Sequence, residues 1–432
     1  MERPAWSAAL IGAMVFVACQ DGDQTDGGEV GTGGGNEGGA GAGTGGAAGS
    51  AGNAGAGTAG AAPAAPVWGI DCGRPAVEAT SPRWEGFERG ITLGNRLDAP
   101  FEGAWGPMLQ ESDFDVAAEA GFDHIRLPVR FNEHADADAP YTVDETFLVA
   151  RVDWAVEHAL DRDLNIILDF HHYEDLHTSV DEHRERFLAI WQQIAEHYAD
   201  APDDVAFELL NEPNTELTPT VWNPLASEAL EIIRQTNPDR TVLIDATDSS
   251  NPSELGSLEI PDDPNIVATF HFYEPSLFVF QGQDWVGPAW GTSGVVFPGP
   301  PQEPVEPVAA AAGDDWAAQW FDDYNTLPIE ENPGGPQAIF DPFEYVEAFV
   351  EQTGIPAYCG EFNAMAGADL ESRATWLRLV REECERRDIG WAVWEDGSTG
   401  YLFDHESSEW SEPLLDALTG PLSEASEEDC AN

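Results

Sequence analysis

The sequence predicts an α/β protein with a single (β/α)8 barrel, the fold also called a TIM barrel. Two observations support this prediction: eight short apolar or β-branched runs recur along residues 67–432, and segments with helical periodicity separate them. Strands that alternate with helices in this way pair in parallel and close into a barrel. An open, doubly wound sheet is the alternative, but no glycine-rich phosphate loop follows the first run, which argues against it.

The candidate strands, in chain order, are Arg89–Leu93, His124–Pro128, Asn165–Asp169, Val205–Leu209, Thr241–Asp245, Ile266–Phe270, Ile355–Cys359 and Gly390–Trp394. Two apolar stripes illustrate the helices between them: Leu148, Val152, Ala155, Val156 and Ala159, and then Phe187, Ile190, Trp191, Ile194 and Tyr198. Residues 274–340, between the sixth and seventh strands, are rich in Pro, Gly and Trp. A connection of this length is typical of a functional loop.

The first residues have the composition of an export leader. Residues 1–19 place Arg3 before the apolar run Ala8–Ala18, which is too short to span a membrane as a helix. The small residue before Cys19 resembles a bacterial lipobox, and we therefore expect a lipid anchor there. An ordinary signal peptide with an incidental cysteine is the alternative. In either case we expect a secreted or cell-surface protein.

A linker follows the leader. Residues 20–66 are dominated by Gly and Ala and show no apolar periodicity, so they cannot form a core. Such a tether would hold the folded domain, residues 67–432, roughly 35–40 Å from its anchor. Export permits disulfides. Four cysteines remain, and they are Cys72, Cys359, Cys384 and Cys430. They allow three pairings, which the sequence leaves open, and Cys359 is alternatively a buried thiol.

The charge of the chain excludes some partners. The 80 acidic and 18 basic residues give a formal net charge of −62 at pH 7, and every basic residue is an arginine. Such a field repels phosphate backbones and anionic membrane surfaces, so we expect no nucleic-acid partner. The acidity is either a device for solubility or an adaptation to salt, which would screen the self-repulsion.

Polar or aromatic residues stand at or just past the ends of the candidate strands. They are Arg126, His171, Asn211, Glu212, His271, Tyr273, Glu361 and Trp394. The loops after barrel strands all open on one face, where barrel enzymes carry their sites. The convergence of side chains from six strands on one rim is hard to explain by packing, and it predicts a site.

Glu212 and Glu361 follow the fourth and seventh strands, so they can face each other across a barrel. Glycoside hydrolysis needs two carboxyls, one to protonate the leaving oxygen and one to attack the anomeric carbon, and retaining enzymes hold them ~5–5.5 Å apart. Two neighbouring acids in a partly dry site raise one pKa, which keeps one of them protonated. Two surface glutamates are the alternative in a chain this acidic.

The other candidate residues suit sugar binding better than metal binding. His171 and His172 are neighbours, and neighbours on a strand point to opposite faces, so we do not expect both to bind one metal ion. The long loop carries Trp285, Trp290, Trp316 and Trp320, which either pack the loop or stack on sugars. Trp394 is the strongest candidate platform, and Trp285 is a further expected substrate contact. The sequence contains no G-x-S-x-G motif, so it gives no support for catalysis by a serine nucleophile.

The residues of this rim stand in motifs that resemble glycoside hydrolase family 5, the cellulase family, and in particular its bacterial endo-β-1,4-glucanases. The resemblance covers residues 90–418. Its pieces are GITLGN (90–95), IRLP (125–128), LDFHHY (168–173), FELLNEP (207–213), FHFYEP (270–275), GEF (360–362) and WE (394–395). Asn-Glu-Pro and Gly-Glu-Phe, in that order and separated by His-x-Tyr, are its most specific part.

The resemblance implies a role for each matching residue. Glu212 would be the general acid/base and Glu361 the nucleophile, with Arg126 and Tyr273 hydrogen-bonded to Glu361. The other implied substrate contacts are Asn95, Asp98, His171, His172, Asn211, His271 and Trp394. The chain departs from the family pattern at two positions. Phe280 occupies a position that is often His in the family, which leaves open whether glucan or mannan is the preferred substrate. Asp396 replaces an aromatic residue that is often found there.

We therefore expect retaining hydrolysis of β-1,4-glucan in an endo mode, by a monomer that needs no metal and no cofactor. Mannan, xyloglucan or β-1,3-glucan is the alternative substrate, which a panel of the polysaccharides would distinguish. A noncatalytic carbohydrate-binding surface protein is the remote alternative, which binding without product release would favour.

Overall fold

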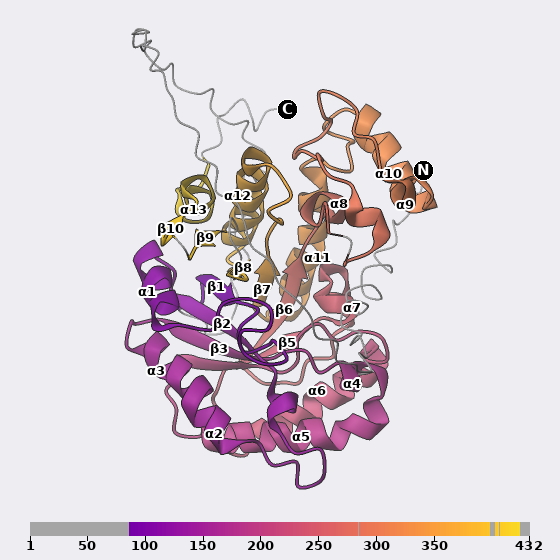
Figure 1. Cartoon of the computed structure of the whole chain (residues 1–432). Coiled ribbons are helices and arrows are strands. Elements are labelled where there is room, and N and C mark those ends of the chain that lie inside the picture. The colour runs from indigo at the N-terminus through magenta and orange to yellow at the C-terminus, as the bar shows by residue number, and fades with distance from the viewer. Residues whose placement is uncertain (1–85, 284, 398–401, 406, 424–432) are drawn as a thin grey trace, which may run out of the picture. The chain divides into compact units, whose positions relative to one another are not determined.

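The computed structural model describes residues 86–283, 285–397, 402–405 and 407–423. The predicted leader and linker, with Cys19, Cys72 and Cys430, lie outside the described residues. Within them, eight parallel strands close into a barrel in the order β1 to β8 (Figure 1). The predicted (β/α)8 barrel is therefore confirmed. None of the helices in the described ranges is long and apolar enough to cross a membrane.

Each predicted strand corresponds to one strand of the barrel. The strands are β1 (Arg89–Leu93), β2 (His124–Val129), β3 (Asn165–Phe170), β4 (Val205–Glu208), β5 (Val242–Asp245), β6 (Ile266–Phe272), β7 (Ala357–Phe362) and β8 (Gly390–Glu395). The largest difference is at the end of β7, which continues past the predicted Cys359 to Phe362. A two-stranded hairpin, β9 (Phe403–Asp404) and β10 (Glu409–Trp410), lies after the barrel.

Helices connect the strands and cover the barrel (Figure 1). They are α1 (Glu111–Ala120), α2 (Glu145–Phe147), α3 (Trp154–Leu160), α4 (Glu174–Thr178), α5 (Val180–His197), α6 (Pro219–Ile233), α7 (Thr247–Ser250), α8 (Ser276–Val279), α9 (Ala309–Ala312), α10 (Asp315–Thr326), α11 (Gln337–Thr353), α12 (Leu370–Arg386) and α13 (Glu412–Thr419). The 3-10 helices are η1 (Phe131–His134), η3 (Pro252–Ser257) and η4 (Pro288–Gly291), and η2 (Leu148–Asp153) is a π-helix. The long connection after β6 thus carries α8, η4, α9 and α10, and α9 and α10 (orange) lie beside each other in Figure 1.

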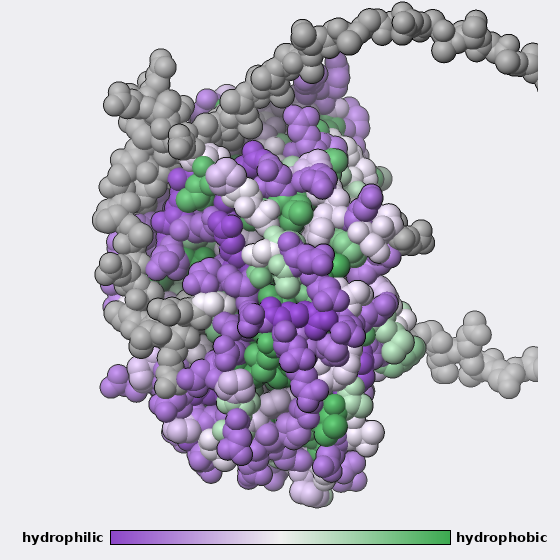
Figure 2. Space-filling model, turned by 90° about the vertical axis from the view of Figure 1, so that its left-hand side faces the viewer, coloured by the Kyte–Doolittle hydropathy of each residue, from purple (hydrophilic) through white to green (hydrophobic). Residues whose placement is uncertain are grey.

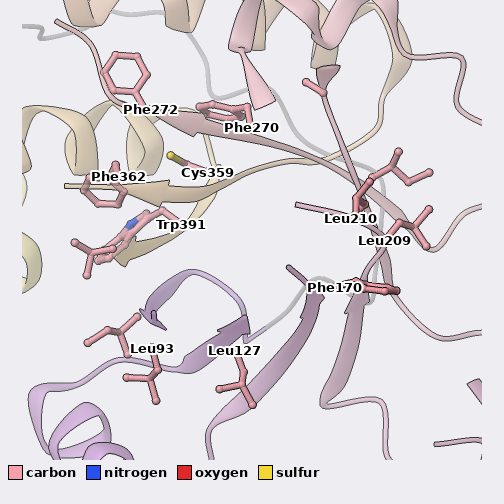
Figure 3. Packing of buried hydrophobic residues seen from close by; sticks show 14 of the residues in the cluster. Leu93, Leu127, Phe170, Leu209, Leu210, Phe270, Phe272, Cys359, Phe362 and Trp391 are labelled. Carbon is pink, nitrogen blue, oxygen red and sulfur yellow. The ribbon is translucent and has the colours of Figure 1, made fainter. Parts of the chain in front are cut away.

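The apolar core has two parts. The larger part fills the space between the strands and the helices, and Figure 3 shows several of its members, among them Phe270, Cys359 and Trp391 from neighbouring strands. Cys359 and Cys384 are both buried free thiols. The smaller part lies inside the barrel and consists of Phe87, Ile167, Ala206, Leu243, Val267, Tyr358 and Ala392. Outside, the face seen in Figure 2 is mostly hydrophilic, with apolar residues in small separate patches.

The interior of the barrel changes from apolar to polar toward the carboxyl ends of the strands. Side chains two positions apart on a strand face the same way. Two positions after four of the inner apolar residues come Asp169, Glu208, Asp245 and Thr269, all 0% exposed. We call these four residues, together with Arg126 of β2, the polar layer. It lies directly under the rim where sequence analysis places the site.

A bulge in β7 turns Glu361 toward the barrel interior. Tyr358 belongs to the inner apolar cluster and Cys359 to the outer one, so regular alternation would point residue 361 outward. The register with β6 shifts here, because Phe270 pairs with Cys359 but His271 pairs with Glu361. Gly360 is the extra residue. A Cβ on it would lie 3.0 Å from Thr269 Oγ1 and 3.1 Å from His271 Nε2, so a larger residue there would push against the side chain of His271.

Candidate active site

Glu212 and Glu361 meet at the carboxyl ends of the strands, with His271 of β6 between them. The His271 Nδ1 atom lies 2.9 Å from Glu212 Oε1 and 3.6 Å from Glu361 Oε2. One oxygen from each carboxyl and one His271 nitrogen all lie within 4.8 Å of one another. The side chain of Glu212 is 16% exposed and that of Glu361 is 7% exposed. The structure thus brings the two predicted carboxyls together in a largely dry setting that still opens to solvent at Glu212.

Glu361 is held by two hydrogen-bond donors. Arg126 Nη1 donates to its Oε1 over 2.8 Å, and the Tyr273 hydroxyl donates to its Oε2 over 2.9 Å. Donors of this kind stabilise the ionised form of a carboxyl and fix its orientation. Glu361 is therefore the carboxyl of the pair that is better prepared to carry a negative charge.

Arg126 is the centre of the polar layer. It is fully buried, and its Nε and Nη2 donate to the two carboxylate oxygens of Glu208 over 2.8 and 2.6 Å. Its Nη2 also lies 3.0 Å from Asp169 Oδ2 and donates to Asn211 Oδ1 over 3.0 Å. Burial opposes the charge of Arg126, but the surrounding carboxylates hold its pKa well above its ordinary value. The guanidinium therefore stays charged and locks the groups below and beside Glu361 in place.

Glu212 stands on a turn with a strained backbone. It adopts a left-handed φ of 49°, which residues other than glycine seldom occupy, whereas the proline at 213 would by itself favour an extended conformation. On the strand side, the Asn211 N–H donates to Phe170 O over 3.0 Å, which ties the turn to β3. On the far side, Asn214 Nδ2 donates to Glu212 O over 2.9 Å. The turn is therefore fixed on both sides of the carboxyl.

The two carboxyls are set to share their protons unequally. Burial raises the pKa of Glu212 to about 7, and the nearby charge of Arg126 only partly offsets this. Burial likewise raises the pKa of Glu361 to about 7, against the opposing effects of His271, Arg126 and the Tyr273 hydrogen bond. Burial lowers the pKa of His271 to about 4, so its ring is neutral near pH 7. Because Glu361 has the stronger donors, we assign the remaining proton to Glu212.

The two adjacent histidines lie side by side, which corrects the expectation that they point to opposite faces. Strand β3 ends at Phe170, and His172 has a left-handed φ of 56°, so the alternation of a strand does not extend to it. The rings of His171 and His172 are 4.3 Å apart and nearly perpendicular. His171 Nδ1 is 2.6 Å from Asp169 Oδ2, and burial lowers the pKa of both rings well below the ordinary value.

The loop after β1 brings Asn95 and Asp98 to the same rim. Asp98 is buried and accepts the backbone N–H groups of Asn95 over 3.1 Å and Arg96 over 2.8 Å. Its Oδ2 lies 3.9 Å from His172 Nε2. Burial raises the pKa of Asp98 to about 6. These two predicted residues are therefore neighbours of the histidine pair rather than of Glu212 and Glu361.

Trp394, at the end of β8, lies across the top of the barrel beside His171. The two rings are 5.9 Å apart and 29° from parallel. A Cβ on Gly94 would come within 2.1 Å of the indole, so glycine at 94 makes room for the ring. The ring is half-buried, and its role as a platform for a sugar remains a prediction.

The four tryptophans of the long connection after β6 have different environments. Trp285 is 41% exposed, and its ring contacts Phe280 edge-on at 6.1 Å; Phe280 in turn packs 5.1 Å from Tyr273. An aromatic row thus leads from the partner of Glu361 to an exposed indole. By contrast, Trp290 is 3% exposed and lies 5.8 Å from the ring of Trp316. The ring of Trp320 stacks on Tyr324 at 4.8 Å, so these three pack the segment itself.

Sequence reasoning missed several residues that shape the site. Glu208, Asp245 and Thr269 of the polar layer could have been found from alternation, since each lies two positions after an inward apolar residue. Trp105 had no signal in the sequence, and its ring lies 5.3 Å from that of His172.

Among the residues that the structure describes, three groups of side chains at or just under the rim have donor atoms close enough together to hold a cation. They are Asp98, His171 and His172; Glu208, Asp245 and His271; and Glu212, His271 and Glu361. All donors are oxygen or imidazole nitrogen, and most are engaged with one another. The expectation that the site works without a metal remains a prediction.

Comparisons with known proteins give consistent matches. The family model described as cellulase, glycosyl hydrolase family 5, matches residues 94–399. Endoglucanase H of Acetivibrio thermocellus is 31% identical over 77% of this chain, which spans only 33% of that relative. A solved hyperthermophilic endo-β-1,4-glucanase, in complex with substrate, is 35% identical, with a TM-score of 0.69 over 79% of this chain and 100% of its own. Cel5A of Thermotoga maritima, in complex with mannotriose, is 35% identical with a TM-score of 0.66 over 78% of this chain and 98% of its own.

Proposed function

The chain belongs to the cellulase family, glycosyl hydrolase family 5, and from this membership we propose that it is a retaining endo-β-1,4-glucanase. The observation that carries the proposal is the pair Glu212 and Glu361, whose oxygens lie within 4.8 Å and share His271. That separation is close to the ~5–5.5 Å between the carboxyls of retaining glycosidases and well below the ~6.5–9.5 Å of inverting enzymes, which need room for a water between the two groups.

The proposed reaction has two steps. In the first, Glu361 attacks the anomeric carbon while Glu212 gives its proton to the leaving glycosidic oxygen, which produces a glycosyl-enzyme and a free chain end. In the second, Glu212 takes a proton from water, whose oxygen attacks the same carbon and releases Glu361. The Arg126 and Tyr273 donors favour the ionised nucleophile, and burial keeps Glu212 protonated near neutral pH.

The proposed substrate is β-1,4-glucan, bound by the remaining rim residues. His171, His172, Asn95 and Asp98 offer hydrogen bonds, and Trp394 offers a flat apolar surface. The rim is polar and dry at the same time, which strengthens each hydrogen bond to a sugar hydroxyl. The expectations of a monomer and of a metal-free reaction stay with this proposal.

A β-mannan is the second candidate substrate. The Thermotoga maritima structure was solved with mannotriose, so a member with similar sequence accepts that sugar. Phe280 adds an apolar ring, 7% exposed, beside Tyr273, at a position where the resemblance leads one to expect histidine. Because a hydrogen-bonding side chain is missing at this position, the site has one group fewer with which to distinguish glucan from mannan.

Initial rates on soluble cellulose, mannan, xyloglucan and β-1,3-glucan, with the anomer of the first product followed by NMR, test the proposal. We expect the highest rate on soluble cellulose, a rapid fall in viscosity from internal cleavage, and a first product with retained β-configuration. Inversion would contradict the two-step mechanism, and a higher rate on mannan would move the assignment to the second candidate.

We also propose that the enzyme is exported and anchored through Cys19. The support is the sequence itself, with its small residue before Cys19 and the Gly- and Ala-rich residues 20–66 behind it. Labelling with a radioactive fatty acid in a bacterial host tests this. Label on the wild-type chain but not on a Cys19→Ser variant is the expected result, and equal labelling of both would contradict it.

A further inference from the structure

The turn that carries Glu212 is tied to the loop after β5. The Glu212 N–H donates to Asp245 Oδ1 over 3.3 Å. Just behind it, the Ser249 N–H donates to Pro213 O over 3.3 Å, and Asn214 Nδ2 lies 3.4 Å from Ser249 Oγ. Two loops from neighbouring strands are thus joined on both sides of one carboxyl.

The β5 side of this junction has an unusual backbone. Asp248, Ser249 and Ser250 have φ values of 55°, 59° and 55°, in the left-handed region that non-glycine residues seldom occupy. Such a backbone conformation is strained for residues other than glycine, and a run of them persists only where the surroundings impose it. Ser250 Oγ donates to Asp245 Oδ1 over 2.8 Å, so the same carboxyl oxygen anchors this turn and the turn of Glu212.

Asp245 itself is costly to bury. It is 0% exposed, and its Oδ2 has no hydrogen-bond partner among the described residues. Burial raises its pKa well above the ordinary value, and the charges of Glu208 and Asp169 add to this. A buried polar group that is only partly satisfied lowers the stability of the fold. Its position is more readily explained by the contact that it makes with Glu212.

We propose that Asp245 is a positioning residue for the acid/base: its Oδ1 holds the backbone of Glu212 and the left-handed turn 248–250 in one arrangement, which sets the distance of the Glu212 carboxyl from the leaving oxygen. This inference rests on the proposed function, because it assigns the proton donor to Glu212. Asp245 acts through the backbone of Glu212, because its side chain is 0% exposed and offers no surface that a substrate could touch. A misplacement of about 1 Å at such a donor can cost on the order of 100-fold in rate.

The experiment compares three variants on two aryl β-cellobiosides. Asp245→Ala removes the acceptor. Asp245→Asn keeps an oxygen acceptor of the same size in a neutral group. Asp248→Asn is the control, because it changes a half-buried carboxyl on the same turn that does not bond to Glu212. The phenyl leaving group needs a proton from Glu212, whereas the dinitrophenyl leaving group departs without one. The measured quantity is kcat/KM, which reports the first, bond-breaking step.

For Asp245→Ala we expect kcat/KM to fall about 30- to 100-fold on the phenyl substrate and less than about threefold on the dinitrophenyl substrate. Asp245→Asn should recover to within about fivefold of wild type on both, and Asp248→Asn should equal wild type. Circular dichroism and the melting temperature check folding. If Asp245→Ala does not fold, a Ser250→Ala variant replaces it, because this change removes a hydrogen bond to the same carboxyl. We then expect a smaller shift, in the same direction, in the ratio of kcat/KM on the phenyl substrate to kcat/KM on the dinitrophenyl substrate.

Three results would overturn the inference: equal loss on both substrates, which indicates general damage; no loss on either; or an Asn variant as defective as the Ala variant. A wild-type enzyme inactive on both cellobiosides would instead overturn the proposed function, and the inference with it. If the wild type and Asp248→Asn are active but Asp245→Ala loses no more activity on the phenyl than on the dinitrophenyl substrate, the inference alone is overturned.

Discussion

The rim around Glu212 and Glu361 and the long segment between β6 and α11 both bury large side chains that carry polar atoms, but for opposite reasons. At the rim, Arg126 and Glu208 are 0% exposed and are kept as a charged or hydrogen-bonded network. In the segment, Trp290 is 3% exposed against Trp316, where burial of apolar area is itself favourable. Burial of charged groups at the rim therefore lowers the stability of the fold in favour of catalysis. Burial of tryptophans in the segment raises it, although the sequence presented these residues as candidates for sugar binding.

This contrast predicts that changes at the rim affect rate more than stability. Glu361→Ala should lower kcat on soluble cellulose by about 10⁴-fold or more, because no other group can form the covalent intermediate. The melting temperature should stay near that of wild type, since Arg126 retains Glu208 and Asp169 as partners. The outcome that would break the comparison is a variant that keeps most of its activity.

The second prediction concerns the proton of Glu212. Glu212→Gln should lower kcat on unactivated glucan by about 10²- to 10⁴-fold, because an amide cannot protonate the leaving oxygen. In the wild type, kcat/KM should fall as the pH rises through about 7, where Glu212 loses its proton. The variant should lack this alkaline limb in its pH profile on an activated substrate. A limb that persists unchanged would assign the titration to another group.

The same variant also has an expected effect on stability, with a defined sign. The folded pKa of Glu212, about 7, lies above its ordinary value of 4.5, so the native state binds the proton more tightly than the unfolded state does. Wild-type stability from this group is therefore present below pH 4.5 and is lost as the pH rises toward 7. Glu212→Gln should match wild type near pH 4 and be more stable above pH 7 by about 1–3 kcal/mol, measured by denaturant unfolding. A variant that is less stable at pH 8 would refute this.

Sequence reasoning predicted the barrel and the rim well because both follow from short-range periodicity. Eight strands with inward alternation fix where a residue such as Asp169 must point, and the motifs mark the strand ends. It could not predict the backbone departures that complete the site. Alternation alone would point Glu361 outward, and the bulge at Gly360 reverses this. The left-handed turn at His172 likewise places its ring beside His171.

The segment after β6 shows the other limit. Its tryptophans have no regular spacing that would assign a face, and the sequence alone left packing or sugar stacking open for each of them, with Trp285 as the expected substrate contact. Only the tertiary contacts separate exposed Trp285 from buried Trp290. The two tryptophans therefore form a matched pair of the same residue type in the same segment, on which the comparison with the rim can be tested.

Trp290→Ala should behave as a core deletion. We expect a loss of about 3–5 kcal/mol in unfolding free energy, the usual range for a buried aromatic residue, with kcat and KM on soluble cellulose within about twofold of wild type at a temperature where the variant is folded. Equilibrium unfolding in urea and initial rates measure the two effects. A large kinetic effect without a stability change would mean that this indole serves the site after all.

Trp285→Ala should show the opposite and smaller effect. Its ring is 41% exposed and touches Phe280, so little core packing is lost, and we expect a stability change below about 0.5 kcal/mol. If the indole stacks on a sugar at the outer end of the aromatic row, its removal should raise KM on long glucan chains by about two- to tenfold, with kcat nearly unchanged. On an aryl cellobioside too short to reach that end of the row, the variant and wild type should have the same KM. An equal rise in KM on both substrates would place the effect at the catalytic carboxyls instead, and the distinction between the two tryptophans would then rest on stability alone.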